Sequence, residues 1–127
     1  MKKFANYLIL IFTLLPLQAC KSMETSQYQA DIEGEILVGH YIYGHEVNSF
    51  KPCGHKYLFW VLGSEEVLDL LAEKYSNYVA NPYDEVYIKI AGNYLNKASD
   101  GFAVDYDGQV QVEKVFLMRK KSNTDCR

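Results

Sequence analysis

Three histidines lie close together in the sequence beside a cysteine, and this group is the first candidate for chemistry. His40, His45 and His55 occur on either side of Cys53, and imidazole and thiolate are ligands that suit copper or zinc. The spacings His-x4-His and Cys-x-His nevertheless match no ligand pattern of a structural zinc site. A copper- or zinc-binding protein is therefore an alternative interpretation, and ordinary loop histidines are the favoured one.

The sequence contains no arrangement typical of a catalytic site. It has neither a Gly-x-Ser-x-Gly motif nor a glycine-rich loop that could hold a phosphate. Ser64 is better explained as the N-cap of a helix than as a nucleophile. Two acidic pairs, at 65–66 and 84–85, lie at the ends of expected elements, where solvated charges are usual. We expect neither an enzyme nor a bound cofactor.

The beginning of the chain has the pattern of a secretory signal peptide. Two lysines precede an apolar run over residues 4–17, which is too short to span a bilayer comfortably. An uncleaved membrane anchor is the less favoured alternative, because polar sequence follows at once. The run ends in Leu17-Gln18-Ala19-Cys20, which resembles the lipobox of bacterial lipoproteins. The resemblance implies that residues 1–19 are removed and that the Cys20 thiol carries a diacylglycerol.

The same resemblance implies a location in the cell envelope. The acyl chains at Cys20 would anchor the protein, and residues 20–30 would form a lipidated, flexible tether. Lys21 stands where lipoproteins of the inner membrane usually carry Asp, so we expect the outer membrane of a Gram-negative bacterium, with the domain facing the periplasm. The net charge of −3 disfavours nucleic acid as a partner.

The remaining sequence predicts one domain over residues 31–127. Hydrophobic residues make up 49% of the chain and aromatic residues 14%, which excludes intrinsic disorder. Helical spacing from Ser64 to Val79 predicts one amphipathic helix with Ser64 as its N-cap. Gly34 and Gly39 mark points where the first strand would bulge or bend. Strand patterns occupy residues 31–43, 56–62, 85–95, 102–106 and 109–119, the second of them apolar enough to be buried on both faces. In the third, Val86, Ile88 and Ile90 alternate with Tyr87, Lys89 and Ala91.

Five strands and a single helix predict a mainly β fold, a small five-stranded OB-like barrel. A split α+β sandwich is the alternative that spacing alone leaves open. Several tyrosines are expected on the strands, where they would either form a binding face or fill the barrel with their hydroxyls reaching the surface. We favour the second interpretation. These tyrosines are Tyr41, Tyr43, Tyr57, Tyr87 and Tyr94.

Two cysteines remain once Cys20 carries lipid. Export would place Cys53 and Cys126 in an oxidising compartment, where an intramolecular disulfide is expected. Closing so long a loop would stabilise the domain by about 4 kcal/mol in the chain-entropy model. The bond would also hold residues 120–124, whose composition is otherwise typical of a frayed tail.

Several short motifs occur along the domain, from about Gly34 to Cys126. They are Gly39-x-Tyr41-x-Tyr43, Phe50-x-x-Cys53 followed by Tyr57, a helix ending in tyrosine, the strand Val86–Gly92 and the terminal Asp125-Cys126. Together they resemble the C-terminal OB-like domain of the NlpE family, envelope lipoproteins linked to copper tolerance and surface sensing. The resemblance implies the same disulfide. No Cys-x-x-Cys occurs in this chain, so the resemblance does not extend to the family's metal-binding N-terminal domain and does not imply copper handling.

We therefore expect a non-catalytic interaction or envelope-stress-sensing module. Its expected partners are the membrane, through the lipid at Cys20, and an envelope protein. In this interpretation the Cys53–Cys126 bond keeps the barrel closed, and failure to form the bond loosens the C-terminal segment and exposes strand edges to a partner. The alternative is a periplasmic copper- or zinc-binding protein that uses His40, His45 or His55.

Overall fold

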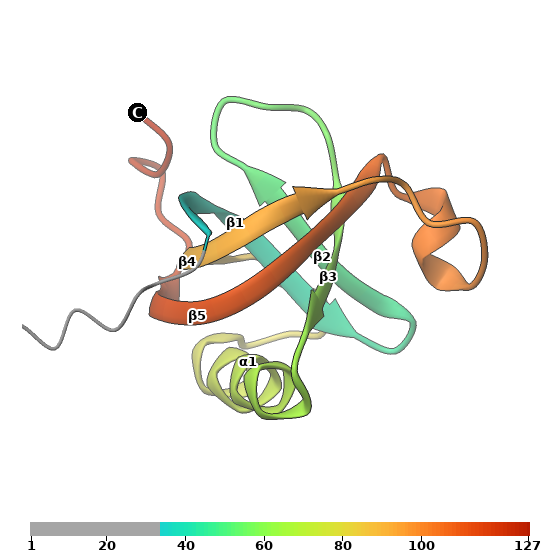
Figure 1. The fold of residues 1–127 in the computed structure, drawn as a ribbon. Coiled ribbons are helices and arrows are strands. Elements are labelled where there is room, and N and C mark those ends of the chain that lie inside the picture. The colour runs from blue at the N-terminus through green and yellow to red at the C-terminus, as the bar shows by residue number, and fades with distance from the viewer. Residues whose placement is uncertain (1–33) are drawn as a thin grey trace, which may run out of the picture.

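The computed structural model describes residues 34–127, which form a closed β-barrel with one α-helix (Figure 1). The expected signal peptide, tether and lipidation site at Cys20 lie outside the described residues. Within the described part, no helix has the length and apolar character needed to cross a membrane. The elements are β1 (Glu35–Gly44), β2 (Val47–Pro52), β3 (Phe59–Gly63), α1 (Glu65–Tyr78), β4 (Val86–Leu95), the 3-10 turn η1 (Phe102–Asp105) and β5 (Gly108–Lys120).

The strands close into a barrel in the order β1-β2-β3-β5-β4. The neighbours are antiparallel except for β3 and β5, which run parallel from Phe59↔Gly108 to Gly63↔Val112. β1 belongs to two ladders, because its first part pairs with β4 and its last part with β2. The mainly β, OB-like barrel with a single helix is thus confirmed, and the split sandwich is wrong because the sheet closes on itself.

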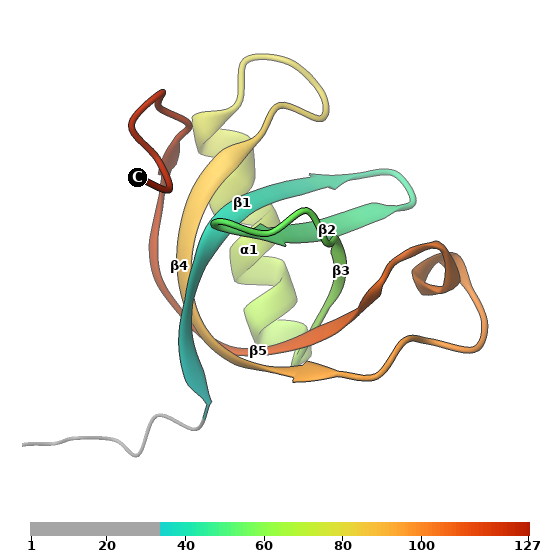
Figure 2. The same cartoon turned by 90° about the horizontal axis from the view of Figure 1, so that it is seen from above.

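The helix α1 closes one end of the barrel. It begins at Glu65, directly after Ser64, whose Oγ accepts a hydrogen bond from the Val67 N–H at 3.3 Å. Glu65 and Glu66 in the first turn complement the positive end of the helix dipole. The predicted helix and its N-cap are therefore confirmed. Figure 1 shows the helix below the strands, and Figure 2 shows it across the end of the barrel.

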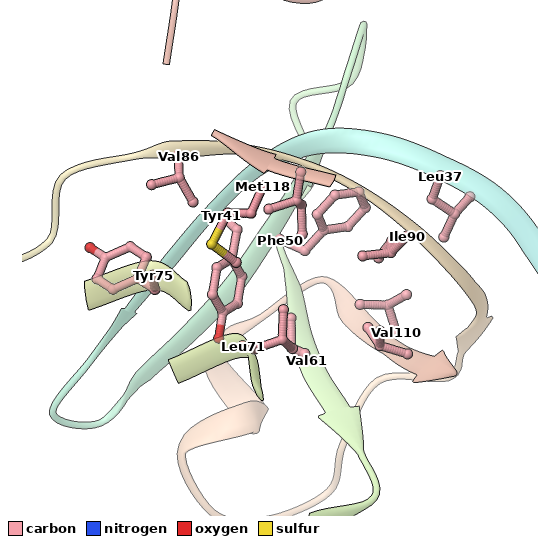
Figure 3. Packing of buried hydrophobic residues seen from close by; sticks show 12 residues of the cluster. Leu37, Tyr41, Phe50, Val61, Leu71, Tyr75, Val86, Ile90, Val110 and Met118 are labelled. Carbon is pink, nitrogen blue, oxygen red and sulfur yellow. The ribbon is translucent and has the colours of Figure 1, made fainter. Parts of the chain in front are cut away.

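The core is formed by side chains that alternate inward along the strands and by two residues of the helix. In β4 the inward residues are Val86, Ile88 and Ile90, as the period-two pattern predicts. Leu71 and Tyr75 of α1 complete the packing from the end of the barrel (Figure 3). The cluster consists of Leu37, Tyr41, Phe50, Val61, Leu71, Tyr75, Val86, Ile88, Ile90, Val110, Val112 and Met118.

One of the five predicted strands, residues 102–106, is not a strand in the structure, and one observed strand was not predicted. Residues 102–106 contain the 3-10 turn η1, which the chain enters through Gly101 at a φ of 69°. The missing strand is β2, which forms a hairpin with β1. Its turn carries no Asn-Gly or Asp-Gly signal, because Glu46 supplies the positive φ of 59° that glycine usually provides. Lys51 and Pro52 in β2 further weaken its strand pattern.

The strand predicted over residues 56–62 is shorter and more exposed than expected. β3 begins only at Phe59. The preceding residue, Leu58, lies in an irregular segment, where its N–H donates to Asp107 Oδ2 at 2.8 Å. Only Val61 of β3 is buried, while Phe59, Trp60 and Leu62 are half-buried. The prediction of a strand buried on both faces is therefore wrong.

The closure by α1 can be tested with two adjacent leucines of the same helix. Leu71 is fully buried and Leu70 is half-buried. We expect Leu71→Ala to lower the free energy of unfolding by about 2–5 kcal/mol, because it removes apolar contacts and leaves a cavity. Leu70→Ala should cost clearly less. Urea unfolding followed by circular dichroism measures both, and equal losses at the two positions would contradict this packing.

Candidate functional site

A disulfide joins the C-terminus to the segment that follows β2. Cys53 and Cys126 lie 73 positions apart in the sequence, and their Cα atoms are 4.9 Å apart. The Cys53 N–H donates to the Val38 carbonyl at 2.9 Å, so this half of the bridge is fixed to β1. The structure thus contains the expected bridge. We call residues 121–126, which lead from the end of β5 to the bridge, the C-terminal latch.

A second attachment of the latch is the carboxylate of Asp125. Its side chain is only 1% exposed, and its Oδ1 lies 2.7 Å from a guanidinium nitrogen of Arg119. Its Oδ2 lies 3.2 Å from His40 Nε2 and accepts from the Ser122 N–H at 2.8 Å. One carboxylate therefore binds side chains of β1 and β5 and also closes a turn of the latch itself.

The two side chains that contact Asp125 belong to a row of residues across three neighbouring strands. His40 of β1 pairs in register with Tyr87 of β4, and Tyr87 pairs with Arg119 of β5. The Arg119 guanidinium lies 4.0 Å from the centre of the Tyr87 ring, and the His40 ring approaches that ring edge-on with the centroids 6.2 Å apart. The row thus positions both of the side chains that contact the carboxylate, His40 and Arg119. A further ion pair, Lys121–Glu85, fixes the start of the latch.

The environment of Asp125 favours its charged form. Burial by itself raises the pKa of this carboxyl, but the Ser122 N–H, the Arg119 guanidinium and the His40 ring outweigh the effect and lower the pKa from 3.8 to about 2. Asp125 is therefore ionised at neutral pH. Because its partners come from the barrel, the charge holds the latch against the barrel surface.

The three histidines do not converge on one site. His40 contacts Asp125 of the C-terminal latch. His45 lies at the tip of the β1–β2 hairpin, where its side chain is 87% exposed and 3.4 Å from Glu46. His55 lines a shallow surface hollow with His40 and the disulfide. Across residues 34–127, no group of three or more His, Cys, Asp or Glu is placed to hold a metal ion. The Cys53 sulfur is also occupied by the disulfide.

The tyrosines divide between the interior and the surface. Tyr41 is fully buried and packs edge-on against Tyr75 with ring centroids 5.8 Å apart. Burial, and secondarily the nearby Tyr43 and Tyr75, raise the pKa of its hydroxyl, which finds no hydrogen-bond partner among the described residues. Tyr57 precedes β3 instead of lying on a strand. Tyr41 therefore fills the barrel, although its hydroxyl does not reach the surface as expected.

Sequence reasoning missed the Asp125 cluster. Asp125 stood out only as a neighbour of Cys126, and Arg119 lies in a strand whose register with β4 shifts at two places. Those shifts decide which β5 residue lies opposite Tyr87, and no residue pattern in the sequence predicts them. The charged residues near the C-terminus were the only signal that the sequence offered. It gave no sign that Asp125 would contact His40 of β1 or that Arg119 would lie over Tyr87 of β4.

The pKa of Asp125 predicts a pH dependence of the latch. Because the folded-state pKa lies below the usual value, the stabilisation by this carboxylate is complete above about pH 4 and is lost as the pH falls towards 2. At pH 7, Asp125→Asn should cost about 1–3 kcal/mol. The difference from the wild type should shrink between pH 4 and pH 2 in thermal unfolding. Asp100→Asn, in an exposed loop, is the matched control, and a pH-independent difference for Asp125→Asn would contradict the assignment.

Comparisons with protein-family models, with curated proteins and with solved structures find no match to this chain. Function is therefore argued from the features just described. These are the closed barrel, the disulfide between Cys53 and Cys126, and the buried carboxylate of Asp125 with its partners on β1 and β5.

Proposed function

We propose that this protein is an outer-membrane lipoprotein, anchored through Cys20 and facing the periplasm, whose OB-like barrel is a non-catalytic interaction and stress-sensing module. The observation that carries the proposal is the C-terminal latch. A disulfide and a buried ion-paired carboxylate, one residue apart, hold the same short segment. The resemblance to the NlpE-family domain, with its corresponding disulfide, supports the same function.

The latch is suited to report the oxidation state of its surroundings. In an oxidising compartment the disulfide forms, and where oxidation fails the segment loses its covalent attachment. Closing the loop of 73 residues contributes about 4 kcal/mol in the chain-entropy model. The charged contacts of Asp125 are weaker and are partly exposed on the Arg119 side. The disulfide is thus the dominant attachment, and its loss changes the latch most.

Loss of the bridge would uncover side chains and leave the strand edges paired. The pairings that close the barrel, β1 with β4 and β3 with β5, do not involve residues 121–126. Release of the latch therefore leaves these ladders in place and frees the row of His40, Tyr87 and Arg119. We accordingly modify the sequence-based mechanism: the signal is this polar and aromatic row, offered to an envelope protein when the latch detaches.

The proposed sensing role is tested by removing the bridge. Cys53→Ser/Cys126→Ser should lower the unfolding temperature and raise the envelope-stress output, measured with a transcriptional reporter in the bacterium that encodes the chain. Leu71→Ala is the control, because it destabilises the packing of α1 against the barrel and leaves the disulfide intact. An unchanged reporter in the double-serine variant, or an equal rise with Leu71→Ala, would contradict a role for the latch.

The proposed anchor is tested separately at the lipobox. The wild type should incorporate radiolabelled palmitate and fractionate with the outer membrane, whereas Cys20→Ala should remain unlabelled because the acyl acceptor thiol is missing. Lys21→Asp should keep the label and move the protein towards the inner membrane. Labelling that persists in Cys20→Ala would exclude this lipidation site.

A further inference from the structure

The β1–β2 turn lies on the side of the barrel away from the C-terminus (Figure 2). Two hollows are lined by residues of this turn. One has a volume of about 560 Å³ and the other about 450 Å³, and both are bordered by Glu46, Val47 and Phe102. They meet at these three residues, and we call the two hollows together the hairpin groove. Its other aromatic and apolar walls come from Tyr43, Leu58, Trp60, Leu68 and Tyr106.

The groove exposes large apolar side chains. Phe102 is 55% exposed and Leu58 42% exposed, although both lie beside well-packed strands. Trp60 is half-buried, with its ring edge-on to Tyr106 at a centroid distance of 5.3 Å. Large aromatic side chains held rigidly at the surface are typical of residues that dominate binding to a partner.

The backbone at the groove is incompletely paired. β2 and β3 pair only at Ser49↔Trp60 and Phe50↔Phe59, and the ladder opens towards the hairpin turn. At the opening, the Val61 carbonyl accepts a hydrogen bond from the side-chain amide of Asn48 at 3.2 Å. A side chain thus replaces a backbone donor there. Separated strands beside an apolar hollow can accept an extended peptide, which adds its own backbone hydrogen bonds.

The charge around the groove is negative. Glu46, Asp69 and Asp105 line it, and among residues 34–127 no lysine or arginine does. His45 also lines it, with its Nε2 3.4 Å from a carboxylate oxygen of Glu46. Asp69 and Asp105 form no ion pair with another described residue. A bound segment that carries positive charges would therefore be complementary to this rim.

We propose that the hairpin groove binds an extended, positively charged segment of a partner protein, in which apolar side chains alternate with lysine or arginine. The apolar side chains would contact Phe102 and Trp60, and the cations would face Glu46, Asp69 and Asp105. The inference rests on the proposed role as an interaction module, and it adds a second partner-binding surface, distinct from the row beneath the latch. Stress output tests that role and peptide binding tests this surface, so each can fail without the other.

The chain contains a single tryptophan, Trp60, which reports directly on the groove. The full-length chain in nonionic detergent is titrated with a peptide of alternating lysine and valine, and the emission of Trp60 is followed. We expect a saturable change that weakens as salt is added. The same peptide with glutamate in place of lysine should not bind, because its charges repel the rim.

Variants separate the rim charges from net charge in general. Glu46→Gln/Asp69→Asn/Asp105→Asn should weaken binding about tenfold. Glu35→Gln/Glu73→Gln/Glu113→Gln removes the same charge at exposed positions elsewhere and should keep the affinity within about twofold. Likewise, Phe102→Ala should weaken binding, and Leu117→Ala, at another exposed apolar site on β5, should not.

Three results would overturn the inference. The first is an absence of saturable binding by the lysine peptide. The second is an unchanged affinity in the Glu46/Asp69/Asp105 variant. The third is binding of a neutral chitin oligosaccharide without binding of the lysine peptide, which would assign the aromatic side chains to sugar stacking instead of peptide recognition.

Discussion

Closure of the barrel depends on β1, which pairs with a neighbour on each edge. Residues 39–41 pair with β2 and with β4 at the same time, so neighbouring backbones lie close to β1 on both edges there. Gly39 permits the close approach, because a Cβ at this position would collide with the Lys51 carbonyl oxygen. The sequence marked Gly39 as a point where the first strand would bulge or bend, and what the structure shows at this glycine is the close approach of β2 to β1.

One consequence is that the outer face of the barrel is organised by strand register. The inward side chains of β1, β4 and β5 form the core, and the residues between them form rows on the outside. The row of His40, Tyr87 and Arg119 exists because β1, β4 and β5 lie side by side at the end where β5 finishes. The latch folds back from this end, so the carboxylate of Asp125 contacts both His40 of β1 and Arg119 of β5.

The sequence predicts the parts of this structure that depend on local patterns. The helix, its Ser64 cap and the alternation in β4 were predicted, because capping and periodicity are properties of neighbouring residues. β2 was missed, because its turn uses Glu46 at positive φ and because its stability comes from pairing with β1. The contacts of Asp125 were missed for a related reason: they depend on the register of strands that are far apart in the chain.

β2 connects the two surfaces to which we assign function. Cys53 directly follows its last residue, and Val47 and Asn48 at its first end border the hairpin groove. On one edge β2 pairs with β1 along its whole length, whereas on the other edge it pairs with β3 at only two positions. The disulfide therefore fixes the end of a strand that is open to β3 at its start. A segment added in the groove would complete the pairing of that same strand, so the bridge and the proposed partner both act on the position of β2.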